Sequence, residues 1–168
     1  MFQPGDLIIY GSNGVCRVDA VGTPAVKGVD ESRLYYTLCP LYSTERIYTP
    51  VDTNVVMRPT ISRREAEELI AQIPQIKENV CDNRNPNLLS THYRTSIESN
   101  SCGDLIQLIK SVYLKARTAE QNGKKPGQVD KRYMKRAEEL LYGELAVALD
   151  IPRDDVLDYI ESQLANVN

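Results

Sequence analysis

The sequence has little of what enzymes and metalloproteins use for their chemistry. Its 168 residues include no tryptophan, one phenylalanine and one histidine, His92. GxxxxGK(S/T), GxGxxG, HExxH and GxSxG motifs are all absent, which argues against the common nucleotide-binding and hydrolase folds. His92 has no acidic neighbour in the sequence, so a helix surface position or a phosphate contact suits it better than a role as general base. We therefore expect no enzyme, no catalytic residue and no small-molecule substrate.

Metal-binding and membrane signals are also missing. The four cysteines, Cys16, Cys39, Cys81 and Cys102, form no CxxC pair. With one histidine, the ligand spacing of a zinc site is absent, and reduced, mostly buried thiols are the simpler interpretation. No apolar run approaches the ~18 residues that span a bilayer, and the first residues lack the pattern of a secretory signal. We expect a cytoplasmic protein without metal, cofactor or membrane contact.

Positive charge is concentrated in one window of the chain. From Lys110 to Arg136 there are nine of the twenty Lys and Arg residues and two acids, Glu120 and Asp130, a net charge of +7. Because the whole chain carries −3, the remainder carries −10. A basic segment in an acidic chain is typical of a surface that binds polyanions, most often nucleic acid. The alternative is a pair of ordinary solvent-exposed helices.

Residues 1–60 have the pattern of short strands separated by turns. Five segments rich in β-branched and aromatic residues are expected to be strands, at residues 6–10, 15–21, 34–38, 46–49 and 55–57. Pro40 and Pro50 are expected at strand ends or edges, because proline cannot donate to a ladder. Several short strands in so few residues predict a small, strongly bent β-barrel of the Tudor or SH3 type.

Beyond the fifth strand the apolar periodicity becomes helical. Ser62 and Glu65 have the spacing of a capping box, and Pro74 is expected to end the helix that follows. The fold class is therefore α+β, with an N-terminal β-barrel domain over residues 1–60 and a C-terminal all-α helical bundle over residues 61–168.

A short helix and its boundary come next. Leu89, Tyr93 and Ile97 are spaced by four and share one face of this helix. Gly103 is expected to break it, and Asp104 to be the N-cap of the following helix.

Two further helices, over residues 104–121 and 130–149, carry the basic window. In the second helix four cations cover an arc of ~140° without an interleaved acid, whereas a merely solvated helix mixes signs at i, i+4. This favours a polyanion-binding face. The candidate phosphate-binding cations are Lys110, Arg117, Lys124, Lys125, Lys131, Arg132, Lys135 and Arg136.

Several segments together resemble the CarD family of bacterial transcription regulators, which shares its N-terminal domain with the transcription-repair coupling factor. Residues 2–10 (FQPGDLIIY) and 14–18 (GVCRV) are similar to the family's F-x-x-G-D-x-V-V-Y and G-x-x-x-V segments, and residues 46–51 (RIYTPV) to its K-L-Y-V-P-V strand. Residues 103–105 (GDL) and 130–146 (DKRYMKRAEELLYGELA) resemble its C-terminal bundle. The resemblance covers nearly the whole chain in the right order.

The resemblance implies two partners and no enzymatic activity. Family members bind the β subunit of RNA polymerase by adding a strand edge of the N-terminal domain to it, and their helical domain contacts promoter DNA at the upstream edge of the bubble and stabilises the open complex. This chain is then a cytoplasmic, monomeric regulator. Because strand faces alternate, at least one of Ile47 and Tyr48 is expected in the core. The polymerase-binding segment implied by the resemblance is Arg46, Ile47, Tyr48, Thr49 and Pro50.

This sequence departs from the family at two places. Several relatives have a DNA-wedging tryptophan where this chain has Leu89, which could be a minor-groove wedge or a core residue. Some relatives have a basic residue in the second hairpin. The corresponding position in this chain lies near Pro24 and Val26, neither of which is basic. Arg94 matches a basic family position and is a candidate phosphate contact, as is His92.

Two other functions remain compatible with the sequence. The chain could be a polymerase- or helicase-docking module that does not bind DNA. It could also be an RNA- or ribosome-associated protein, for which exposed aromatic stacking platforms are expected. The candidate tyrosines for such platforms lie in predicted strands, which favours the core for them. They are Tyr10, Tyr35, Tyr36, Tyr42 and Tyr48.

Overall fold

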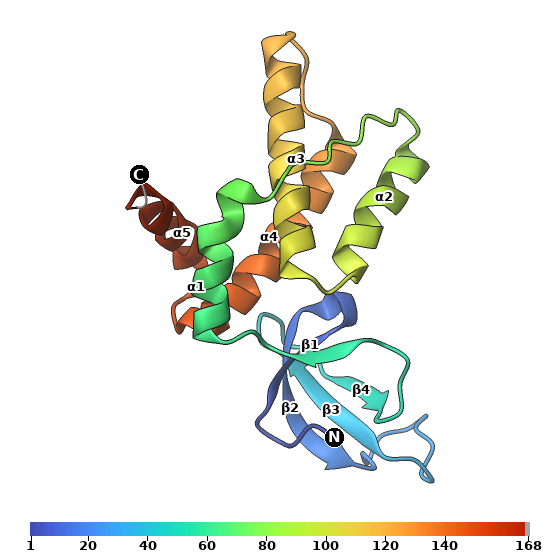
Figure 1. The fold of residues 1–168 in the computed structure, drawn as a ribbon. Coiled ribbons are helices and arrows are strands. Elements are labelled where there is room, and N and C mark those ends of the chain that lie inside the picture. Colours follow the sequence, from blue (N-terminus) through green and yellow to red (C-terminus); the bar gives the residue numbers. More distant parts are fainter. Residues whose placement is uncertain (167–168) are drawn as a thin grey trace. The chain divides into compact units, whose positions relative to one another are not determined.

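The computed structural model describes residues 1–166, which divide into two compact units, Met1–Thr60 and the chain from Ile61 onward (Figure 1). The first unit is built of strands and the second of helices, and each has its own hydrophobic core. The predicted fold class, a small β domain followed by a helical region, is confirmed. Within residues 1–166 no helix is both long enough and apolar enough to cross a bilayer.

The β unit is one five-stranded antiparallel sheet with the order β4-β3-β2-β1-β5. Consecutive strands β1 to β4 pair in a meander, and β5 returns to pair with the other side of β1, so β4 and β5 are the two edges. All five strands lie close to their predicted positions. Their bounds are Leu7–Tyr10 for β1, Val15–Gly22 for β2, Tyr35–Pro40 for β3, Ile47–Pro50 for β4 and Met57–Pro59 for β5.

The core of the β unit comes from alternating residues of the central strands. A register shift between Val18 and Ala20 leaves Asp19 as an extra residue in β2, and such a bulge bends the strand and increases its twist. This bend helps a small sheet to curve around its own apolar side chains. The buried members of the core are Ile8, Tyr10, Cys16, Val18, Tyr36 and Leu38.

Five α-helices form the described part of the second unit, residues 61–166. Helices α3 and α4 make a hairpin, α2 packs against both, and α1 and α5 pack against α4 and each other (Figure 1). A loop of largely exposed residues joins η2 to α2, as the polar sequence predicts. The helix bounds are Arg63–Gln72 for α1, Pro86–Glu98 for α2, Cys102–Gln121 for α3, Gln128–Leu149 for α4 and Val156–Ala165 for α5, with 3-10 turns Ile73–Gln75 (η2) and Arg153–Asp155 (η3).

Helix caps confirm one prediction and correct another. The predicted capping box is present, because the Ser62 side chain accepts from the Glu65 amide at 3.1 Å and the Glu65 carboxylate accepts from the Ser62 amide at 3.3 Å. The prediction that Asp104 caps α3 is wrong, since Ser101 is the N-cap and Gly103 lies inside the helix. The break before α3 occurs instead at Asn100, whose φ of 59° is the left-handed conformation that asparagine tolerates.

Candidate functional sites

The outer edge of β4 has main-chain groups that no other strand of residues 1–166 uses. Strand β4 pairs only with β3, with Tyr36 opposite Thr49. Next to β4, the Val51 amide donates to the Leu34 carbonyl at 3.0 Å. Because successive amides of a strand point to opposite sides, the amides of Val51 and Thr49 face β3, and the N–H and C=O of Tyr48 face the open edge. Tyr48 is therefore the centre of this edge.

The side chains of β4 alternate as a half-buried strand requires. Thr49 is 4% exposed and its hydroxyl accepts from the Tyr10 hydroxyl at 3.1 Å. Ile47 lies on the same face and packs against the β core, so it is the core residue of the predicted pair. The other face carries the half-buried Tyr48 and Pro50, and the exposed Arg46 precedes the strand. Tyr48 and Pro50 thus lie on the face away from the core, whereas the polar Thr49 lies on the buried face.

Two lysines of the basic window are used inside the helical unit. Lys110 Nζ donates to the carbonyls of Ile73 and Ile76 at 2.8 and 2.6 Å and lies 3.8 Å from Glu78 Oε1. The side chain is 22% exposed. The ammonium group therefore neutralises the end of η2, and we do not retain Lys110 among the DNA contacts, contrary to the prediction.

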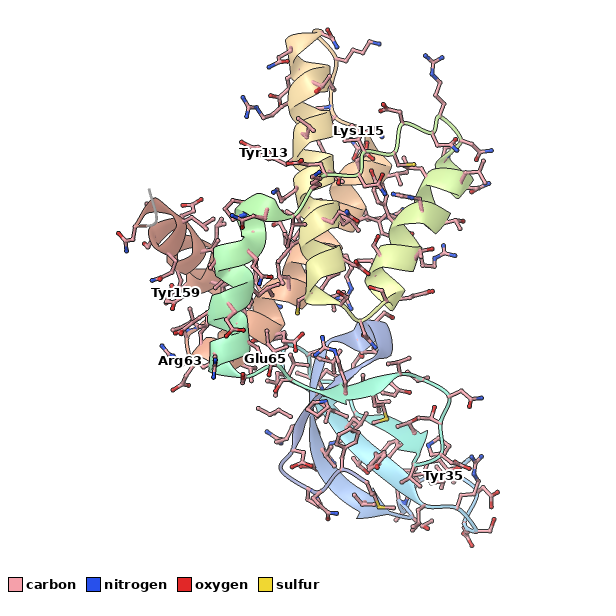
Figure 2. All side chains as sticks on the ribbon, viewed as in Figure 1. Tyr35, Arg63, Glu65, Tyr113, Lys115 and Tyr159 are labelled. Atoms are coloured by element: carbon pink, nitrogen blue, oxygen red, sulfur yellow. The ribbon has the colours of Figure 1, made fainter. Side chains whose placement is uncertain are left out.

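Lys115 is the second inward lysine. Its Nζ donates to the Cys81 carbonyl at 2.8 Å and to Asp130 Oδ1 at 3.1 Å, and the same Asp130 oxygen accepts from the Tyr93 hydroxyl. Figure 2 shows Lys115 on the side of α3 opposite Tyr113, which is exposed. Asp130 is only 5% exposed, so this network lies in the interior. It joins α2, α3, α4 and the loop before α2, which contains Cys81.

The remaining seven bases of the window are exposed, around the α3–α4 turn and the first turns of α4. The only exposed acid within the same window is Glu120. Arg136 also pairs with Glu139, at 3.3 Å. We call these seven residues the basic end of the hairpin: Arg117, Lys124, Lys125, Lys131, Arg132, Lys135 and Arg136.

The candidates on α2 have different environments. Leu89 is 7% exposed and lies in the helical core with Tyr93 and Ile97, so the core alternative describes it. Leu88, its neighbour, is 56% exposed. The half-buried His92 ring lies 5.5 Å from the Tyr93 ring. Leu88 is therefore the leucine at the start of α2 that faces solvent.

Arg94 reaches from α2 toward the first turns of α4. Desolvation raises the pKa of the Tyr133 hydroxyl, but hydrogen bonds from the side chains of Arg94, Ser90 and Arg132 outweigh it, so the pKa is lowered overall. The guanidinium carbon of Arg132 lies 5.2 Å from the centre of the Tyr133 ring. Arg94 and Arg132, predicted from separate segments, thus both lie near the Tyr133 side chain.

Comparison with known families assigns the β unit. Residues 2–61 match the family model of the CarD-like/TRCF RID domain. Residues 2–61 form an RID. The match is consistent with a CarD-like protein, as the sequence predicts, and apart from Ile61 the helical unit lies outside it.

An RID is an RNA polymerase-interacting domain and not a catalytic one. Its presence supports binding of this chain to RNA polymerase, in general through the β subunit. In this RID, Pro24 and Val26 lie in the loop between β2 and β3, beside the exposed Lys27. Tyr10 and Tyr35 are buried, which removes them as stacking platforms for RNA bases.

The sequence does not predict the inward roles of Lys115 and Asp130. From the sequence alone, Asp130 is one of the two acids of the basic window and Lys115 is one more of its cations. A weak signal was available, because Lys115 lies one residue from the apolar face that includes Val112 and Ala116. A lysine beside an apolar stripe often buries its stem and needs a partner for its head group.

Proposed function

We propose that this protein is a non-enzymatic transcription regulator that bridges RNA polymerase and promoter DNA. Its RID binds the β subunit of the polymerase, its basic end contacts DNA phosphates near the upstream edge of the bubble, and the two contacts together stabilise the open complex. The observation that carries the proposal is an RID whose edge strand β4 leaves the main-chain groups of Tyr48 unused by any other strand of residues 1–166.

The polymerase contact is an added strand. An open edge gives affinity through main-chain hydrogen bonds and specificity through alternate side chains. In β4 the N–H and C=O of Tyr48 supply the main-chain part, while Tyr48 and Arg46 supply side chains on the face away from the core. Ile47 and Thr49 support the strand from inside the RID. Pro50 limits the added strand, because it has no N–H to donate.

The DNA contact is electrostatic and independent of base sequence. Seven exposed bases can approach phosphates, and phosphate contacts position a protein without reading bases. Intrinsic affinity can be weak, because docking one domain raises the effective concentration of the other to about the millimolar range. For an apolar contact at the bubble edge we choose Leu88 rather than Leu89, since a wedge must be accessible.

Two substitutions at one position test the polymerase contact. Tyr48→Ala removes the side chain and keeps the outward N–H, whereas Tyr48→Pro also removes that N–H without touching a β3–β4 bond. We expect both variants to remain folded by circular dichroism, and Tyr48→Pro to weaken polymerase binding and shorten the open-complex lifetime more than Tyr48→Ala. Equal, native-like lifetimes for both variants would refute the added strand.

A charge-matched pair tests the DNA contact. Lys131→Glu and Arg64→Glu change the net charge equally, but Arg64 lies on α1, outside the basic end, 89% exposed and paired with Glu68. In fluorescence anisotropy with a DNA duplex, Lys131→Glu should weaken binding and reduce the salt slope by about 1, while Arg64→Glu should change little. If both variants bind DNA as native protein does, the chain is a polymerase-docking module without a DNA contact at this surface.

A further inference from the structure

An exposed tyrosine lies on the polar outer surface of α3. Tyr113 is 60% exposed, and within residues 1–166 no other aromatic side chain is more than half exposed. The next residue, Leu114, is 43% exposed, so apolar surface continues around this turn of the helix. Figure 2 shows Tyr113 on the outer side of α3, away from Lys115. Packing within the helical unit therefore does not account for a large aromatic residue at this position.

The Tyr113 ring is paired with a cation from the next turn of α3. The guanidinium carbon of Arg117 lies over the ring, 5.9 Å from its centre, at the i, i+4 spacing of helix neighbours. Within residues 1–166 Arg117 forms no ion pair with an acid. Because the ring is 60% exposed with Arg117 in place, most of its surface stays accessible. Aromatic rings and arginine planes are the surfaces on which proteins stack unpaired nucleic-acid bases.

The charge beyond the ring suits the backbone of a nucleic-acid strand. From Tyr113 to Lys125 the exposed charged side chains are one acid, Glu120, and three cations, a net charge of +2. The Lys124 amide donates to the Ala119 carbonyl at 2.8 Å, which holds the α3–α4 turn against the last turn of α3. Ala119 lies about 9 Å from Tyr113 along the helix axis. The stacking ring and the cations thus follow one another along one end of the helix. The three cations are Arg117, Lys124 and Lys125.

We propose that Tyr113 and Arg117 form a stacking site for an unpaired base of single-stranded DNA. One base lies on the Tyr113 ring, and the neighbouring phosphates lie among the cations of the α3–α4 turn. The choice of DNA rests on the function proposed above, because a transcription bubble contains unpaired bases, whereas the stacking site rests on the exposure of Tyr113 and the position of Arg117. Stacking tolerates any sequence, since every base has a π-face. The site therefore distinguishes single strands from duplex DNA without reading sequence.

Substitutions at Tyr113 separate stacking from charge in fluorescence anisotropy. Tyr113→Ala removes the ring and keeps every cation, so it should weaken binding of oligo(dT) by about fivefold or more, the loss of one stacked base. Duplex binding and the salt slope for oligo(dT) should stay unchanged, because the paired bases of a duplex are not available and the number of cations is the same. Alanine is the best helix former, so the variant should remain folded by circular dichroism. Leu157→Ala is the matched control and should bind as native protein does, because Leu157 is a 45% exposed apolar residue of α5, outside the basic end.

A tryptophan at the same position detects the contact directly. The chain has no tryptophan, so Tyr113→Trp introduces a single indole. Its fluorescence should be quenched by oligo(dT) and not by an abasic oligomer with the same number of phosphates. Equal quenching by the two oligomers, or equal affinity of native protein for both, would show a contact with phosphates alone and refute stacking.

The outcomes distinguish this site from the proposed function. Native oligo(dT) affinity for Tyr113→Ala, together with weaker duplex binding by Lys131→Glu, would overturn the site and leave the proposed function intact. Native affinity for both variants would overturn both. Weaker oligo(dT) binding by Tyr113→Ala alone would support the site and contradict the duplex contact. If native protein binds oligo(U) more tightly than oligo(dT), and Tyr113→Ala weakens both, the ligand is RNA and the assignment to single-stranded DNA fails.

Discussion

Removal of Lys115 tests the energetic role of the buried polar network in the helical unit. Its side chain is 21% exposed and that of Asp130 is 7% exposed, with 3.1 Å between Nζ and Oδ1. In Lys115→Met an apolar chain of similar length replaces the cation. The Asp130 carboxylate then keeps only the Tyr93 hydroxyl, and the Cys81 carbonyl loses its donor.

The cost follows from leaving a buried charge without its counterion. Breaking such a pair from one side costs ~3–5 kcal/mol, and the partial exposure of Lys115 places the expected value near ~3 kcal/mol. With a urea m-value of about 2 kcal/mol/M, the unfolding midpoint of the helical unit falls by ~1.5 M. Because Asp130→Asn leaves an amide that still accepts from Tyr93, the double variant should cost at least about 1 kcal/mol less than the sum of the single variants.

Urea unfolding of the full chain, followed by far-UV circular dichroism at the helical wavelength, measures this effect. The β unit has its own core and supplies an internal reference. A midpoint shift below ~0.3 M for Lys115→Met, or strict additivity in the double variant, would refute the reasoning. Lys115→Met should leave the salt slope of DNA binding unchanged while the protein is folded, since its ammonium group faces the interior and is not among the exposed cations.

Two further predictions concern buried side chains. Leu89→Ala should destabilise the helical unit by ~2–5 kcal/mol because it opens a cavity in the core, whereas Leu88→Ala should cost less than about 0.5 kcal/mol. Thermal denaturation of the two variants measures both losses of stability. Equal losses would contradict the assignment of Leu89 to the core and Leu88 to the surface. Burial is the main cause, and the charge of Cys39 the second, that raises the pKa of the Cys16 thiol to about 11. In folded protein at pH 8, Cys16 should therefore remain unmodified by iodoacetamide, whereas the half-buried Cys39 should react. Alkylation of Cys16 as fast as that of Cys39, measured by peptide mass spectrometry, would contradict the buried position.

Local sequence signals predicted the elements of this fold well. The strand ends at Pro40 and Pro50 and the capping box at Ser62 follow from the chemistry of single residues and their immediate neighbours. The boundary before α3 was misplaced because Asn100 adopts the left-handed conformation that was expected of Gly103. Both residue types tolerate that conformation, so the sequence alone did not decide between them.

The candidate sites were less predictable because they depend on contacts between distant segments. Lys110 and Arg117 are seven residues apart and share one side of α3, yet Lys110 turns to carbonyls more than thirty residues away in the sequence. No helical periodicity contains that information. In the same way, the open edge of β4 follows from the sheet order and not from the composition of the strand.

The inward and outward charges of the basic window have connected roles in the proposed function. Asp130 directly precedes Lys131 and Arg132, and its carboxylate is fixed by Lys115 and Tyr93 in the interior. The first turn of α4 is thereby held where the exposed cations begin, and Tyr133 is packed on Tyr93 at the same place. A regulator that is already docked on polymerase needs a DNA contact of defined position more than one of high affinity, because the docked domain supplies effective concentration. In the proposed function the inward pair of Lys115 and Asp130 therefore contributes to DNA binding through geometry, while the exposed arginines and lysines contribute through charge.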